Sequence, residues 1–137
     1  MKGLGWHVIA ELSGVDPKVL DDEQLLIKIM VEAAKKAGLT VLATKTHKFS
    51  PQGVSAVVIV SESHLFIHTW PEFGYAALDV FSCKDEESTW TAYNEIVKKL
   101  RPRGVQVIMI KRGMLQRQEL PVPPLGQEGY QIEQLQR

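Results

Sequence analysis

A serine stands between a carboxylate and a histidine in the run Glu62-Ser63-His64. This run separates two apolar segments, residues 54–60 and 65–68, and therefore predicts a tight turn between two strands. A serine hydroxyl held in such a turn can attack the carbonyl just upstream, at Glu62 in its own backbone. This attack needs a strained, exposed turn and a base or hydrogen-bond donor nearby.

Two other readings of the same residue types are weaker. His64 and His68 suggest a metal site, but on a strand four residues span about 13 Å, which is too far for one metal ion. Cys83 and His68 suggest a hydrolase, but no oxyanion-hole motif accompanies them. Taken alone, Cys83 reads as a small buried hydrophobe and His68 as a core histidine on a strand.

Six segments rich in valine, isoleucine and aromatic residues predict the strands that position these groups. They are residues 5–12, 39–48, 54–60, 65–70, 76–82 and 105–111.

Two helices are expected between the strands. The first begins at Asp21 as N-cap, with Gln24 three residues later, and ends at Gly38. The second follows the acidic run starting at Asp85 and ends at Pro102, and acids at its start with bases at its end suit the helix dipole. The first helix has one apolar stripe, made of Leu25, Leu26, Ile29, Met30, Ala33, Ala34 and Ala37.

The fold class expected from these elements is α+β, with a mostly antiparallel six-stranded sheet and two helices on one face. Residues 54–60 are almost continuously apolar, which predicts burial on both faces of the sheet. Two helices cannot cover both faces, so a second copy of the sheet is expected, giving an α/β/β/α sandwich dimer. The alternative is a monomer whose second face is covered by the C-terminal tail.

The composition of the chain limits the kinds of binding partner and the cellular location that are expected. Sixteen basic residues balance sixteen acidic ones, so neither nucleic acid nor an anionic membrane surface is an expected partner. No apolar run reaches the roughly 18–20 residues of a membrane span, and no long apolar segment at the N-terminus suggests secretion. The single cysteine fits a reducing cytoplasm.

The chain divides near residue 115. Residues 1–115 carry the strand and helix patterns, and residues 116–137 mix glutamine and proline without apolar periodicity. The second segment therefore predicts an extended or partly mobile tail.

The string GVSAVVIVSESHLFIHTWPE, followed by Cys83 in DVFSCKD, resembles the small prokaryotic S-adenosylmethionine decarboxylases. The resemblance covers roughly residues 3–115 and is most specific from Lys48 to Asp85. Its strength lies in the spacing, with Ser55 eight residues before Ser63 and Cys83 twenty after it.

The resemblance implies that the chain is a proenzyme cut between Glu62 and Ser63. Ser63 becomes a covalent pyruvoyl group, with Ser55 and His68 assisting the cleavage by hydrogen bonding and proton movement. The pyruvoyl group forms a Schiff base with the substrate amine and replaces pyridoxal phosphate, and no metal is expected. Cys83 is then the donor that reprotonates the substrate carbon.

The resemblance also implies the substrate contacts. Phe49 and Trp70 hold the adenine and the sulfonium of S-adenosylmethionine between two aromatic faces. Glu72 accepts hydrogen bonds from the ribose hydroxyls. The product is decarboxylated S-adenosylmethionine, the aminopropyl donor for spermidine synthesis, and the enzyme is expected to be a homodimer or a dimer of dimers.

Two alternatives stay open at this level. Pyruvoyl relatives that decarboxylate arginine or ornithine have nearly the same processing motif, and an unprocessed relative would be a binding or regulatory protein with Ser63 intact. Three residues depart from the usual family pattern: Trp6 where a basic residue is common, and Ala56 and Lys84 where glycine is.

Overall fold

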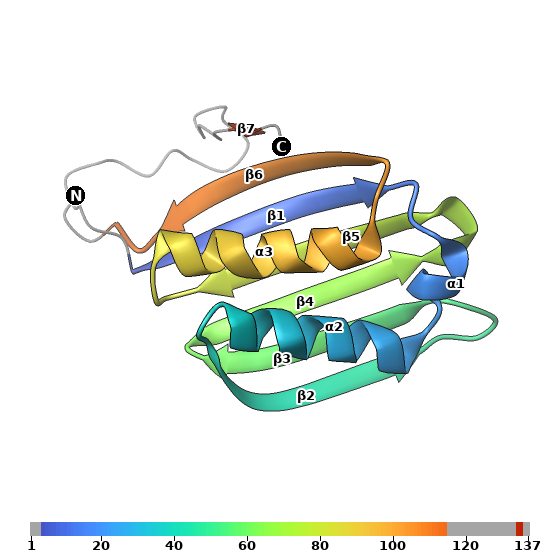
Figure 1. Ribbon diagram of the computed structural model, residues 1–137, viewed down its shortest axis with the longest axis horizontal. Helices are drawn as coiled ribbons and strands as arrows, with labels where there is room; N and C mark the ends of the chain where they lie inside the picture. The colour runs from blue at the N-terminus through green and yellow to red at the C-terminus, as the bar shows by residue number, and fades with distance from the viewer. Residues whose placement is uncertain (1–3, 115–133, 136–137) are drawn as a thin grey trace, which may run out of the picture.

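The computed structural model describes residues 4–114 and 134–135, which form one sheet with helices on one side (Figure 1). Within these residues the sheet has the strand order β2-β3-β4-β5-β1-β6-β7, and every neighbouring pair is antiparallel. The strands are β1 (Gly5–Ser13), β2 (Thr40–Lys48), β3 (Val54–Ser61), β4 (Ser63–Trp70), β5 (Tyr75–Ser82), β6 (Gly104–Arg112) and β7 (Gln134–Leu135).

Strands β1 to β6 confirm the six predicted strands, each within two residues at either end. Strand β7 was not predicted. It pairs with β6 through Val107 opposite Leu135 and Ile108 opposite Gln134. It lies in the segment 116–137, which was expected to be a tail and of which the remaining residues lie outside those described.

The helices are α1 (Pro17–Leu20), α2 (Glu23–Lys36) and α3 (Glu86–Leu100). The predicted start of the first helix was wrong by one residue, because Asp22 is the N-cap of α2 and accepts a hydrogen bond from the Leu25 amide at 3.0 Å. Gln24 then falls one position too early for a capping box. The four-residue helix α1, capped by Asp16, was not predicted.

Helix boundaries elsewhere follow the sequence signals. Gly38 has a φ of 78° just after α2, as expected for a glycine stop. The carboxylate of Asp85 accepts from the Ser88 amide at 2.6 Å and begins α3, and Arg101 ends it with a φ of 53°. Among the described residues, no helix is long and apolar enough to cross a membrane.

Helices α2 and α3 lie side by side on the same face of the sheet (Figure 1). Strand residues facing them are buried, and those of β3 are Val54, Ala56, Val58 and Val60. Between them, Val57 is half-buried and Ile59 is 45% exposed. Within one chain, residues 54–60 are therefore buried on the helix side only. We call the other side of the sheet the open face.

Thr69 connects three elements in the core. It is 5% exposed, and its hydroxyl accepts a hydrogen bond from the Val54 amide at 2.9 Å. The same hydroxyl donates to the Leu20 carbonyl at 2.7 Å. The start of β3, the end of β4 and the end of α1 are thus held at one point.

We expect Thr69→Val to destabilise the protein by about 1–3 kcal/mol, because the isosteric valine leaves the buried Val54 amide and Leu20 carbonyl without partners. Urea unfolding at one protein concentration measures the change. The control is Thr44→Val on the exposed strand β2, which should stay within about 0.5 kcal/mol of the parent. If the two variants have equal free energies of unfolding, the hydrogen bonds of the Thr69 hydroxyl do not stabilise the fold.

Candidate active site

The turn between β3 and β4 holds its serine in an unusual backbone conformation. Ser63 has a φ of 124°, a region that residues with a side chain rarely adopt. Such a conformation costs roughly 1–3 kcal/mol and persists only where the surroundings impose it. Ser63 begins β4 and pairs with Ser82 at the end of β5, so the sheet holds it on both sides.

Cys83 contacts this turn through both its side chain and its backbone. Its Sγ lies 3.2 Å from the hydroxyl of Ser63. Its amide donates a hydrogen bond of 3.3 Å to the carbonyl of Glu62, which is the carbonyl that Ser63 would attack. A donor at this oxygen polarises the carbonyl and stabilises negative charge that develops there. Sequence reasoning assigned a role to the thiol and missed the amide, which only strand pairing reveals.

A second group of predicted residues lies at the opposite end of β3 and β4. Ser55 and His68 are register partners, and the Ser55 hydroxyl lies 2.8 Å from His68 Nδ1. The ring of His68 stacks on Phe66, with centroids 4.4 Å apart. This fixes the ring plane and leaves Nε2 free of the Ser55 contact, so His68 has one nitrogen paired with a hydroxyl and another available for proton transfer.

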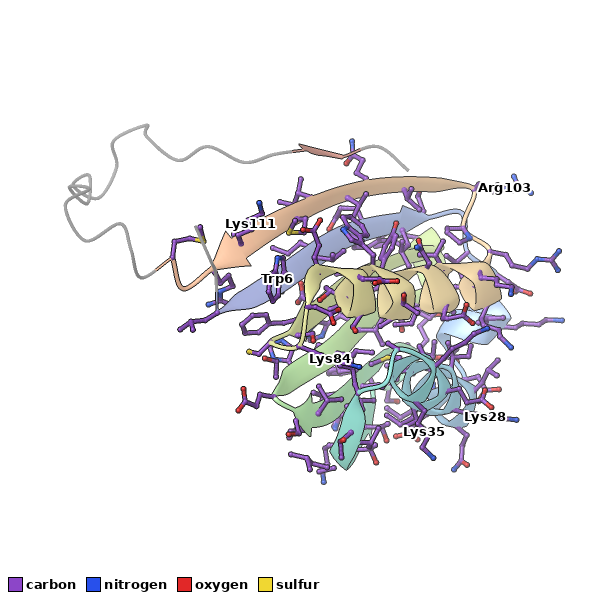
Figure 2. All side chains as sticks on the ribbon, turned by 60° about the vertical axis from the view of Figure 1, so that its left-hand side comes forward. Trp6, Lys28, Lys35, Lys84, Arg103 and Lys111 are labelled. Atoms are coloured by element: carbon purple, nitrogen blue, oxygen red, sulfur yellow. The ribbon has the colours of Figure 1, made fainter. Side chains whose placement is uncertain are left out.

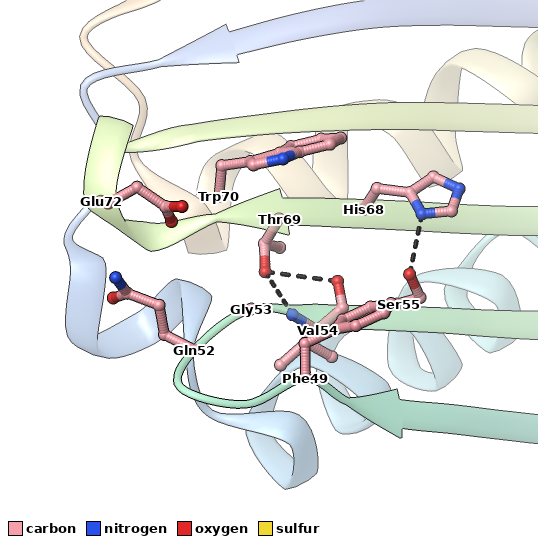
Figure 3. Close-up of a pocket in the computed structure, with 9 residues that line it drawn as sticks. All are labelled: Phe49, Gln52, Gly53, Val54, Ser55, His68, Thr69, Trp70 and Glu72. Atoms are coloured by element: carbon pink, nitrogen blue, oxygen red, sulfur yellow. Dashed lines mark hydrogen bonds between the residues drawn. The ribbon is translucent and has the colours of Figure 1, made fainter.

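Beside this pair is a pocket of about 340 Å³ (Figure 3). Phe49 and Trp70 line it and are 48% and 40% exposed, which leaves aromatic surface open to a ligand. Glu72 also lines it, from the short helix η1 (Pro71–Phe73). The full lining is Phe49, Gln52, Gly53, Val54, Ser55, His68, Thr69, Trp70 and Glu72. The three residues expected to bind substrate thus share one pocket with Ser55 and His68.

Sequence reasoning missed Gln52, which lines the pocket, and Tyr75, which supports its wall. Tyr75 is the register partner of Trp70, and their rings stack with centroids 5.2 Å apart. Burial and a hydrogen bond to Glu11 raise the pKa of the Tyr75 hydroxyl to about 12. No sequence signal marks either residue, since both roles depend on which strands pair and where a loop lies.

The two groups are well separated within one chain. Ser63 and His68 lie on the same strand five residues apart, which corresponds to about 17 Å. Neither Ser63 nor Cys83 lines the pocket. One chain therefore brings the predicted residues together as two groups: the nucleophile with Cys83 at one end of the sheet, and the proton-transfer and binding residues at the other.

His64, which follows the nucleophile, belongs to a cluster on the neighbouring strands. Its ring meets the edge of Phe81 at 5.7 Å and lies 6.1 Å from His7. Burial lowers the pKa of His64, and His7 and Arg112 lower it further, against an opposing effect of Asp79. His64 is therefore neutral at pH 7 and packs as an aromatic ring.

Lys84, a departure from the family pattern, makes hydrogen bonds with both its side chain and its backbone. Its ammonium donates to the Gly38 carbonyl at 3.4 Å, toward the end of α2 (Figure 2). Its amide donates to the hydroxyl of Ser82 at 3.1 Å. Lys84 thus ties the loop that carries Cys83 to the helix layer. Ala56, another departure, is a core residue that is 1% exposed.

The described part of the chain contains no group of three or more histidine, cysteine or acidic residues that could hold a metal ion. The chemistry available from these residues is nucleophilic attack at the turn, proton transfer by His68 and the thiol, and aromatic binding in the pocket.

Comparison with known proteins shows the family of the chain. The family model for S-adenosylmethionine decarboxylase matches residues 6–113, which include both groups. A Caldicellulosiruptor saccharolyticus protein named S-adenosylmethionine decarboxylase proenzyme is 53% identical over 116 residues, 85% of this chain and 94% of that protein. A Methanococcus maripaludis protein of the same name is 48% identical over 120 residues, 88% of this chain and 98% of that protein. The crystal structure of the adenosylmethionine decarboxylase from Aquifex aeolicus matches with a TM-score of 0.81 and 34% identity, over 85% of this chain and 97% of that one.

Proposed function

The chain belongs to the S-adenosylmethionine decarboxylase family, and from that premise we propose that it cleaves itself at Ser63 and then decarboxylates S-adenosylmethionine. The observation that carries the proposal is the strained Ser63 beside a Glu62 carbonyl already hydrogen-bonded by the Cys83 amide. The family match ends at residue 113, which supports a catalytic domain of residues 1–115 with residues 116–137 outside it.

Self-cleavage begins when the Ser63 oxygen attacks the Glu62 carbonyl carbon and the peptide C–N bond breaks, leaving an ester. Loss of the Ser63 α-proton then breaks the bond between Cβ and the ester oxygen, which releases Glu62 as a carboxylate. Water replaces the nitrogen as ammonia leaves, and residue 63 ends as a pyruvoyl group. The Cys83 amide stabilises the oxyanion in the first step.

The residues present fit a pyruvoyl group at position 63. Residue 63 is the first residue of β4 and lies at an exposed turn. The thiol of Cys83 lies 3.2 Å from the Ser63 hydroxyl. When formed, the group supplies a carbonyl that takes up the electrons left by departing CO₂, so neither pyridoxal phosphate nor a metal is needed. Cys83 delivers the proton to the substrate α-carbon. This role requires a free thiol, which agrees with a reducing cytoplasm.

His68 is too far from Ser63 in its own chain to move a proton there. The open face offers a solution, because Ile59 is 45% exposed on it and Val57 and Phe66 are only half-buried. Two copies packed through this face about a two-fold axis that runs perpendicular to β4 would bring the Ser63 end of each chain against the His68 end of the other. We therefore propose a homodimer with two shared sites, each using Ser63 and Cys83 of one chain and Ser55 and His68 of its partner.

Substrate recognition in the proposal rests on the pocket of about 340 Å³ beside His68. Phe49 and Trp70 present flat faces to the adenine and the sulfonium. Glu72 accepts from the ribose hydroxyls. Decarboxylated S-adenosylmethionine, the aminopropyl donor for spermidine synthesis, is the proposed product.

The first test is self-cleavage. Purified protein should separate into residues 1–62 and 63–137, with a blocked N-terminus on the second fragment, and Ser63→Ala should remain one chain because it lacks the nucleophile. Intact-mass analysis measures both. If the parent chain stays whole after long incubation at neutral pH, it is not a self-processing enzyme, and an unprocessed binding protein is favoured.

The shared site is tested by mixing two inactive chains. Ser63→Ala cannot be cut, and His68→Ala should be cut slowly. When the two are co-expressed, mixed dimers restore one complete site, so the His68→Ala chain should be cleaved.

The matched control replaces the Ser63→Ala partner by a chain carrying both Ser63→Ala and His68→Ala, which cannot supply the missing histidine. Cleavage should then stay slow, as judged by the mass of each tagged chain. If both mixtures behave alike, His68 does not act across an interface.

Substrate choice is tested by CO₂ release from S-adenosylmethionine, arginine and ornithine at equal concentration. Stacking on one aromatic ring is worth roughly 1–3 kcal/mol, so Phe49→Ala should lower kcat/KM for S-adenosylmethionine about ten- to a hundredfold and leave self-cleavage unchanged. A higher kcat/KM for arginine or ornithine would reassign the substrate and leave the pyruvoyl mechanism in place.

A further inference from the structure

The loop that carries Phe49 is held from outside the sheet. Residues 49–53 connect β2 to β3, and the Phe49 amide donates to the Gly53 carbonyl at 2.8 Å. Phe49 is 48% exposed, and its ring meets the His47 ring edge to face, with centroids 4.5 Å apart. Core packing therefore does little to orient this ring, and the path of the loop decides where it lies.

Asp21 binds both ends of this loop through one oxygen. Its Oδ1 accepts from Lys48 Nζ at 2.6 Å and from the Gly53 amide at 2.8 Å. The hydrogen bond from Lys48 and then that from Gly53 lower the pKa of Asp21, so it is a carboxylate throughout the neutral range. Asp21 caps no helix with its side chain, because Asp16 and Asp22 cap α1 and α2.

Gly53 makes this contact in a conformation that suits glycine alone. Its φ is 110°, and a Cβ there would lie 3.2 Å from the Thr69 carbonyl oxygen. The loop thus passes close against β4, next to Trp70. The amide that Asp21 accepts from belongs to a residue that lines the pocket.

The backbone next to Trp70, the other aromatic residue of the pocket, is held at the same junction between α1 and α2. The Leu20 carbonyl accepts from the Thr69 hydroxyl at 2.7 Å, and Thr69 precedes Trp70. Leu20 is the last residue of α1, and Asp21 follows it directly, before α2 begins at Glu23. One junction therefore holds the backbone on both sides of the gap between Phe49 and Trp70.

We propose that Asp21 is a positioning residue for substrate, which sets the spacing of Phe49 and Trp70 by clamping the loop of residues 49–53 to the junction between α1 and α2. It touches no reacting atom. The inference rests on the proposed function, since the spacing matters only if a flat purine enters between the two rings. Self-cleavage uses Ser55 and His68, which the pairing of β3 with β4 holds opposite each other, so the clamp on the 49–53 loop acts on binding and leaves self-cleavage alone.

The experiment compares Asp21→Ala, which removes both contacts, with Lys48→Met, which removes only the ion pair. The control is Glu95→Gln, which breaks an ion pair with Lys36 (3.3 Å) between α2 and α3, away from the pocket. Each protein is tested for the rate of self-cleavage, for kcat and KM with S-adenosylmethionine, and for the Kd of 5′-methylthioadenosine by calorimetry.

Since a hydrogen bond to a charged acceptor is worth about one power of ten in an equilibrium constant, Asp21→Ala should raise KM and Kd about tenfold. Lys48→Met should raise them less, and Glu95→Gln should match the parent. Self-cleavage and kcat should stay within about twofold of the parent in all three.

The inference is overturned if Asp21→Ala leaves KM and Kd unchanged while the parent is active, or if it slows self-cleavage as much as it raises KM, which marks a general structural role. A parent that neither decarboxylates S-adenosylmethionine nor binds the nucleoside overturns the proposed function itself, and the inference with it.

Discussion

The antiparallel register of β3, β4 and β5 is the constraint on which both groups of residues depend. It pairs Ser55 with His68 at one end and Ser63 with Ser82 at the other. The second pairing carries Cys83 to the Glu62 carbonyl and the Ser63 hydroxyl. A slip of one residue in β4 would move every side chain of that strand to the opposite face and separate both pairs. The hydrophobic alternation of β3 and β4, buried against α2 and α3, prevents such a slip.

This register also explains how a small chain can hold two incompatible environments. The turn at Ser63 needs strain and a polarised carbonyl, whereas the pocket at Phe49 and Trp70 needs open aromatic surface. Putting them at opposite ends of β4, with Ser63 and His68 about 17 Å apart, keeps the strain out of the binding region. In the proposed dimer the two environments meet across the open face, so that assembly completes a site that neither chain has alone.

Elements with many repeated local signals were predictable. Strands β1 to β6 lie within two residues of their predicted ends because β-branched runs and turn residues mark them. Helix α1 was missed because four residues carry no periodicity. The start of α2 was displaced because Asp21 and Asp22 are both good N-caps by residue type, and only the contacts of Asp21 with Lys48 and Gly53 show which one is otherwise engaged.

The sequence by itself determined the family, and residue types and spacing along the chain marked Ser63, His68 and Cys83 as the expected reactive groups. It also determined which face of each strand is apolar. Only the tertiary structure decided which of these residues meet. The reason is that contact between distant residues depends on strand register and loop path, and these are set by packing and hydrogen bonds summed over the whole sheet. The amide of Cys83 on the Glu62 carbonyl, the distance between Ser63 and His68, and the clamp at Asp21 all arise at that level.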